Sequence, residues 1–145
     1  MIREAPKDVL QQALCFAAEV HAGMVRKGTN IPYILHPMEA AAIVGSMTSD
    51  PEILAAAVLH DVLEDTPVTA AVLEDRFGSR VAELVAAESE DKRDTLPAEE
   101  TWRVRKEETI SHLRQTSDTG EKMIALGDKL SNIRAMYRDH LEIGN

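Results

Sequence analysis

The sequence has 145 residues and a net charge of −9, and 44% of its residues are hydrophobic. A chain of this length can bury one sizeable core, so we predict a single domain over residues 1–145. The acidic balance argues against general binding to nucleic acid backbones, although a metal and a few cations can still hold an anionic small ligand.

The apolar residues are mainly Ala, Leu, Val, Ile and Met, and aromatic residues make up only 3%. This mixture favours helices over sheets. The amino terminus is charged from Arg3 onward and lacks the apolar run of a signal peptide, and the longest apolar run, residues 53–59, is too short to span a bilayer. We therefore predict a cytoplasmic protein without a membrane partner. Cys15 lies in an apolar stretch and is predicted to be a buried structural thiol.

The first predicted helix covers residues 8–25, where apolar residues recur at three- and four-residue spacing. A basic turn follows at residues 26–30 (RKGTN). We expect an extended backbone at His36, because a residue before proline is pushed out of the helical region. Pro37 then precedes a helix over residues 38–47.

The next helix begins at the N-cap Asp50 and carries the run AAAVLHDVLEDT at residues 55–66. At about 100° per residue, its ionisable side chains share one side of a continuous helix, opposite an apolar arc. Three carboxylates on one turn repel one another unless a cation or hydrogen-bond donors compensate. These ionisable residues are His60, Asp61, Glu64 and Asp65.

The second half of the chain predicts further helices and no strand. Thr69 caps a helix that ends at Phe77, Gly78 ends it, and Ser79 starts the next. A charged segment at residues 88–94 leads to a polar helix, where Trp102, Arg105 and Lys106 are assigned to packing and charge pairing. The polar and final helices span residues 97–113 and 121–140. The predicted fold is an all-α bundle of six or seven helices.

A metal site needs more ligands than the His60-Asp61 pair supplies. The chain also offers His36 and Asp128, and two imidazoles with two carboxylates suit Mn²⁺, Fe²⁺ or Zn²⁺ better than Mg²⁺ or Ca²⁺. Glu64 and Asp65 follow one turn later, where they can deprotonate a water or protonate a leaving oxygen. Spacing alone leaves the alternative of a solvated acidic helix end and an ordinary polar Asp128.

Five stretches follow one another along the chain: residues 25–37 (VRKGTNIPYILHP), 59–66 (LHDVLEDT), 77–85, 90–92 (EDK) and 126–134 (LGDKLSNIR). Together they resemble the HD-domain metallohydrolases, and more closely the alarmone hydrolases. This branch comprises the hydrolase domain of RelA/SpoT-type proteins and the small stand-alone enzymes. A His-Asp pair alone is weak evidence, but the ordered set is specific and covers nearly the whole chain.

The resemblance implies three groups of site residues. The implied ligands of an Mn²⁺ ion are His36, His60, Asp61 and Asp128. The implied catalytic pair, which acts on the attacking water, is Glu64 and Asp65. The implied substrate-binding residues are Arg26, Lys27 and Asn132. The implied reaction is hydrolysis of the nucleotide (p)ppGpp at its 3′ position, which releases pyrophosphate and leaves GDP or GTP.

Some positions depart from the family pattern or have two readings. Gly127 stands where the family usually has Ala, which we expect to loosen the helix by up to ~1 kcal/mol. Glu88-Ser89-Glu90 stands where many alarmone hydrolases carry Val-Thr near the base. Tyr33 either packs under the metal site or stacks on substrate, and His21 is assigned to a helix end. Two lysines that could reach phosphates are Lys92 and Lys129.

Two alternative functions remain open at this point. One is an HD phosphohydrolase that acts on another nucleotide or phosphoester. The other is a module that binds nucleotide or metal without catalysis, which would not need the Glu64-Asp65 pair. The sequence leaves the oligomeric state open.

Overall fold

The computed structural model describes residues 2–90 and 95–143, which form helices joined by turns and loops. Within these residues the only β-type pairing is an isolated antiparallel bridge between Val25 and Pro32. The predicted all-α class is confirmed. The helices are α1 (Val9–Val20), α2 (Leu35–Gly45), α3 (Pro51–Val58), α4 (Val62–Asp65), α5 (Ala70–Phe77), α6 (Ser79–Glu88), α7 (Ala98–Gln115) and α8 (Thr119–Ile143).

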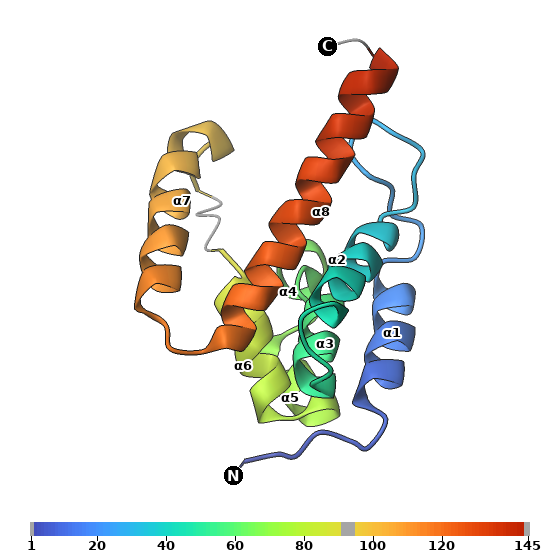
Figure 1. Cartoon of the computed structure of the whole chain (residues 1–145), viewed down its shortest axis with the longest axis vertical. Helices are drawn as coiled ribbons and strands as arrows, with labels where there is room; N and C mark the ends of the chain where they lie inside the picture. Colours follow the sequence, from blue (N-terminus) through green and yellow to red (C-terminus); the bar gives the residue numbers. More distant parts are fainter. Residues whose placement is uncertain (1, 91–94, 144–145) are drawn as a thin grey trace.

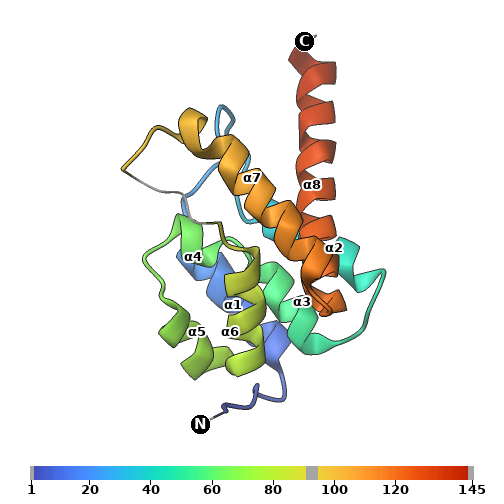
Figure 2. The same cartoon turned by 90° about the vertical axis from the view of Figure 1, so that its left-hand side faces the viewer.

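Helix α3 lies at the centre of the fold and packs against α1, α2, α6 and α8. Figures 1 and 2 show α1 to α6 gathered into one body, which the long α8 crosses before it projects beyond it. Helix α7 stands outside this body, and Thr101 is its only buried residue. Across residues 2–90 and 95–143, none of the helices combines the length and the hydropathy that a membrane crossing requires.

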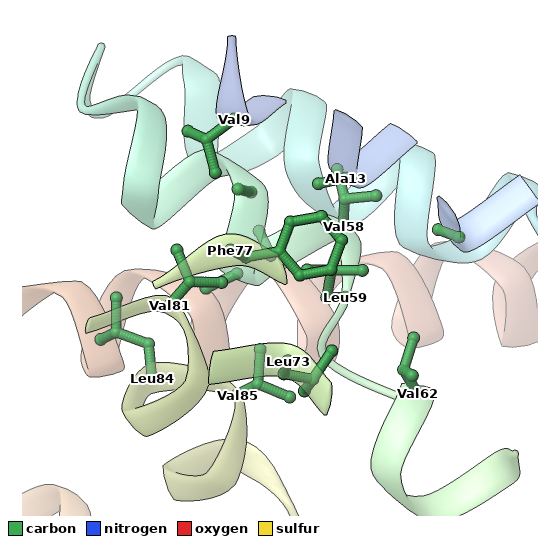
Figure 3. Close-up of a cluster of buried hydrophobic side chains, with 14 of the residues drawn as sticks. Val9, Ala13, Val58, Leu59, Val62, Leu73, Phe77, Val81, Leu84 and Val85 are labelled. Carbon is green, nitrogen blue, oxygen red and sulfur yellow. The ribbon is translucent and has the colours of Figure 1, made fainter. Parts of the chain in front are cut away.

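Helix α3 is apolar on every side, as expected of a helix enclosed by others. Its residues 55–58 are all buried. Figure 3 shows the side chains around its carboxyl-terminal end, where Val58 and Leu59 lie close to Phe77 of α5 and Val81 of α6. This packed core holds the segment that follows α3 in place.

The central helix is interrupted, whereas the sequence predicted one continuous helix. Helix α3 ends at Val58 and α4 begins at Val62. Between them, His60 Nδ1 lies 2.7 Å from the Ala57 carbonyl oxygen, which a continuous helix would pair with the Asp61 N–H. This side-chain hydrogen bond competes with the helix. The prediction that residues 60–65 share one side of a single helix is therefore wrong, and residues 2–90 and 95–143 form eight helices where six or seven were expected.

His36 lies inside a helix, whereas the sequence predicted an extended residue. Helix α2 begins at Leu35, so His36 and Pro37 occupy its second and third positions. Proline is tolerated there because the N–H groups of a first turn have no partner within the helix. Two tight turns lead into α2, from Leu35 N–H to Pro32 O and from His36 N–H to Tyr33 O.

Several predicted helix ends are confirmed by their capping contacts. Asp50 accepts a hydrogen bond from the Glu52 N–H at the start of α3. Thr69 accepts from the Val72 N–H at the start of α5. Gly78 has a φ of 95°, the left-handed region that glycine adopts most easily, where α5 gives way to α6.

Three local predictions are wrong. Helix α1 ends at Val20 rather than near residue 25, because the chain turns at Gly23, whose φ is 80°. Cys15 is exposed rather than buried, because it lies on the solvent side of α1. Trp102 is 57% exposed, so packing does not account for it.

Gly127 lies where α8 meets α2. A Cβ atom on Gly127 would lie 2.8 Å from the Ala40 carbonyl oxygen and 2.9 Å from Val44 Cγ2. The sequence predicted only that this glycine loosens α8. In the structure it also permits the close approach of two helices, and this approach places the next residue, Asp128, against α2.

We predict that Gly127→Ala lowers the free energy of unfolding by about 1–3 kcal/mol, because the Ala40 backbone must move. This loss should exceed the helix propensity that alanine gains. Urea denaturation followed by circular dichroism measures it. The matched control is Gly45→Ala, whose Cβ would meet only the Leu54 side chain, at 3.7 Å, and which should not lose stability. Unchanged stability of Gly127→Ala would contradict the prediction.

Candidate metal centre

Four side chains from distant parts of the chain converge on one point. His36 comes from α2, His60 and Asp61 from the interruption after α3, and Asp128 from α8. The His36 and His60 Nε2 atoms are 3.2 Å apart, and Asp128 Oδ1 lies 3.1 Å and 3.2 Å from them, respectively. Asp61 Oδ2 lies 3.0 Å from His60 Nε2 and 3.4 Å from His36 Nε2. All four candidate ligand atoms lie within 4.8 Å of one another, and these four residues are called the cluster below.

Both imidazole rings turn Nε2 toward this point. His60 Nδ1 faces the Ala57 carbonyl oxygen, which can only accept, so Nδ1 carries the proton and donates it. His36 Nδ1 lies 2.9 Å from the Ser131 hydroxyl. Each ring is therefore held from behind by a hydrogen bond, and its other nitrogen is directed at the two carboxylates.

The donor set fits one divalent transition metal ion. Neighbouring ligands at about 2.1 Å from a single ion lie roughly 3 Å apart, in agreement with the separations between these nitrogen and oxygen atoms. Two imidazoles with two carboxylates suit Mn²⁺, Fe²⁺ or Zn²⁺. Two carboxylates this close and this little exposed also need a positive charge between them.

The electrostatics of the cluster also favour a cation. Burial opposes the charged form of His60, but Asp61 and Asp128 outweigh it and raise the pKa of His60 well above its ordinary value. Burial likewise opposes the charged carboxylate of Asp128, but its close contacts with the His36 and His60 rings hold the pKa of Asp128 well below its ordinary range. Both carboxylates remain charged at neutral pH, since the pKa of Asp61 is lowered too, against burial, by His60.

Tyr33 and His21 form the wall behind the cluster. The Tyr33 hydroxyl donates to Asp61 Oδ2 at 2.5 Å, and burial raises the pKa of Tyr33 far above its ordinary value, so the hydroxyl stays protonated. This contact supports the prediction that Tyr33 packs against the cluster, while its place in the lining of both cavities leaves contact with a substrate open. His21 ends α1 as predicted, but its ring is buried 5.3 Å from the Tyr33 ring, and burial lowers the pKa of His21. The sequence carried one signal for Tyr33, its place three residues before His36.

Two cavities meet at the cluster, and Tyr33, His36 and Asn132 line both. The larger, of about 400 Å³, lies between α2, α8 and the turn before α2. Its wall is mainly apolar and includes Ile31, Leu35 and Met38, with Arg26 at its edge. The Arg26 guanidinium also lies 3.7 Å from the Asp139 carboxylate.

The smaller cavity, of about 270 Å³, is lined by many charged side chains and is called the polar cavity below. Its acidic lining residues are Asp61 and Asp128 of the cluster together with Glu64, Glu88 and Glu90. Its basic lining residues are Arg105, Lys106 and Lys129.

The sequence assigned Arg105 and Lys106 to charge pairing alone. Both pair with Glu90, at 3.1 Å and 3.0 Å, which confirms the pairing, but both also face the polar cavity. Lys129 Nζ donates to Asp128 Oδ2 at 2.7 Å. Burial raises the pKa of Glu88 to about 8, so this carboxyl is mainly protonated at neutral pH beside Asp128.

The remaining predicted site residues differ in whether they lie in the two cavities. Glu64 lines the polar cavity and accepts a hydrogen bond from the Glu90 N–H, whereas Asp65 is exposed and interacts with the Tyr33 hydroxyl. Asn132 Nδ2 donates to Asp128 Oδ1 at 3.2 Å. Lys27 is exposed and lines neither cavity. Lys92 lies outside the described residues.

The sequence matches a family model described as "HD domain" over residues 13–142. Because this match covers most of the sequence, the chain belongs to the HD domain family. The helical bundle and its His-Asp cluster, which α2, the segment after α3 and α8 supply together, agree with that membership.

Two relatives and two solved structures show how similar the chain is to known proteins. It is 39% identical over 132 residues to the bifunctional (p)ppGpp synthase/hydrolase SpoT of Escherichia coli. That alignment covers 88% of this chain but only 18% of SpoT. It is 38% identical over 134 residues to the guanosine-3′,5′-bis(diphosphate) 3′-pyrophosphohydrolase MESH1 of Danio rerio, which covers 90% of this chain and 70% of MESH1.

A solved structure described as a metazoan ortholog of SpoT that hydrolyses ppGpp matches with a TM-score of 0.76 and 33% identity. The match covers 89% of this chain and 70% of that one. A structure from Listeria monocytogenes matches with a TM-score of 0.66 and 34% identity, over 76% of this chain and 67% of that one. The chain thus spans most of these compact relatives and a small part of the large bifunctional ones.

We predict that His60→Ala and Asp61→Ala each abolish stoichiometric binding of a divalent metal, because each removes one of four converging ligands. Metal content after dialysis, measured by inductively coupled plasma mass spectrometry, checks this. The matched controls are His140→Ala and Asp75→Ala, which remove exposed side chains that line neither cavity. A full metal complement in either cluster variant would contradict the assignment.

Proposed function

We propose that this protein is a metal-dependent pyrophosphohydrolase of guanosine alarmones, which removes the 3′-pyrophosphate of (p)ppGpp to give GDP or GTP. The observation that carries the proposal is the convergence of His36, His60, Asp61 and Asp128 at the junction of two cavities. The names of the relatives support the substrate. We also propose that residues 1–145 act as a single hydrolase domain.

The two cavities differ in the way that the two ends of such a substrate differ. The larger, mainly apolar cavity suits a nucleoside, with the Arg26 guanidinium at its edge and Asn132 where it meets the polar cavity. The polar cavity suits the 3′-pyrophosphate, because Arg105, Lys106 and Lys129 can offset its negative charge. Lys27 remains a proposed contact that would need the substrate to reach beyond both cavities.

The proposed metal is a single Mn²⁺ ion held by the four converging side chains, with Fe²⁺ or Zn²⁺ as the other candidates. When bound, such an ion lowers the pKa of a water and offsets phosphate charge. We assign to Glu64 and Asp65 the proton transfers, since Glu64 lies in the polar cavity and Asp65 beside Tyr33. Water attacks the phosphorus bonded to the 3′ oxygen, the P–O3′ bond breaks, and the 3′ oxygen takes up a proton.

We predict that metal-stripped protein resupplied with Mn²⁺ converts ppGpp to GDP and pyrophosphate in equal amounts, and that Asp61→Ala does not. Chromatography of the nucleotides with a coupled pyrophosphate assay measures both products. A panel of other nucleotides and phosphoesters runs in parallel. Turnover of another compound without turnover of ppGpp would replace the substrate assignment, and binding without any turnover would indicate a sensing module.

We predict that Glu64→Gln and Asp65→Asn keep the bound metal but lower kcat by about 10²-fold to 10⁴-fold, as expected when a proton-transfer group is removed. Metal content and single-turnover rates are measured on the same samples. Glu83→Gln, on the neighbouring α6, is a control outside both cavities. Unimpaired turnover by Asp65→Asn would refute the role of that residue.

A further inference from the structure

His36 is connected to a carboxylate outside the metal centre through one hydroxyl group. Its Nδ1 lies 2.9 Å from Ser131 Oγ, and Ser131 Oγ lies 2.6 Å from Glu39 Oε1. His36 and Glu39 are three residues apart and therefore neighbours on α2, whereas Ser131 comes from α8. Ser131 is only 2% exposed, so its hydroxyl depends on these two groups rather than on solvent.

The direction of these hydrogen bonds follows from what each group can donate. An ionised carboxylate can only accept, so the single hydroxyl proton of Ser131 is directed at Glu39. The Ser131 oxygen is then an acceptor toward His36, and Nδ1 must carry the ring proton. The Nε2 of His36 is left with its lone pair, directed at His60, Asp61 and Asp128.

We infer that Glu39 and Ser131 are positioning residues, which hold His36 in the tautomer and orientation that a metal ion requires. The inference rests on the metal centre of the proposed function but not on its substrate. Neither residue touches the four converging ligand atoms or was singled out by the sequence, because they are 92 positions apart and only the α2–α8 contact joins them.

The two histidines differ in how they are held. The Nδ1–H of His60 donates to the backbone carbonyl of Ala57, which every residue type supplies. The Nδ1–H of His36 depends on side chains alone, so substitution of Ser131 or Glu39 can let the His36 ring change its tautomer. Without an acceptor there, the ring can carry its proton on Nε2, the nitrogen that faces the other ligands, and the lone pair that a metal ion needs is then lost. Loss of such a partner typically weakens metal binding by about 10–100-fold.

The test measures the affinity of the metal-free protein for Mn²⁺ from the electron paramagnetic resonance signal of free Mn²⁺. Ser131→Ala should raise the dissociation constant by about 10–100-fold. Glu39→Gln should raise it less, since an amide still accepts a hydrogen bond but also lets the hydroxyl turn toward His36. Ser131→Thr, which keeps the hydroxyl, should restore binding. Ser111→Ala and Glu107→Gln on α7 are matched controls, and thermal unfolding verifies that each variant is folded.

A second measurement separates positioning from a general loss of structure. The ¹⁵N chemical shifts of the His36 ring, recorded at alkaline pH on metal-free protein, report which nitrogen carries the proton. We expect Nδ1–H in the wild type and a mixture of tautomers in Glu39→Gln, whose partly exposed side chain tolerates the change.

Wild-type affinity in Ser131→Ala together with an unchanged His36 tautomer in Glu39→Gln would overturn the inference. Absence of Mn²⁺ binding by the wild type would overturn it as well. Failure of ppGpp turnover, with the affinities changed as expected, would count against the proposed substrate and leave the positioning role supported.

Discussion

The close contact between α2 and α8 is the constraint on which the site depends. Gly127 lets the two helices approach until a Cβ would collide with the backbone of Ala40. The next residue of α8, Asp128, then reaches the Nε2 atoms of His36 and His60, and Ser131, one turn later, reaches the other side of the His36 ring. One helix contact thus supplies a ligand and the group that orients another ligand.

The interruption after α3 is the second feature on which the metal centre depends. In a continuous helix the side chains of His60 and Asp61 would point about 100° apart. The hydrogen bond from the His60 ring to the Ala57 carbonyl ends the helix there, and both side chains turn to one point. The buried apolar helix behind them keeps this irregular segment in place, because its core contacts cannot be exchanged for water.

Of the two cavities beside the metal centre, one is mainly apolar and the other is lined by charged side chains. The apolar cavity and the charged one share Tyr33, His36 and Asn132, so a ligand that fills both must pass over the cluster. Residues of α6, α7 and α8 contribute to the lining of the polar cavity. The basic side chains among them already pair with Glu90 and Asp128. A phosphate group of the proposed substrate would therefore compete with carboxylates of the protein, and its affinity would depend on the salt bridges of α7.

The sequence by itself determined the helical class, the cap at Asp50 and the set of chemical groups, because short-range periodicity and ordered motifs carry that information. It could not place His36 within α2, the end of α3 at Val58, or the pairing of Glu39 with Ser131. Those features depend on competition between side-chain and backbone hydrogen bonds and on contacts between helices far apart in the chain. Only the packed tertiary structure decides such contacts, since no local pattern records which distant residue completes a hydrogen bond.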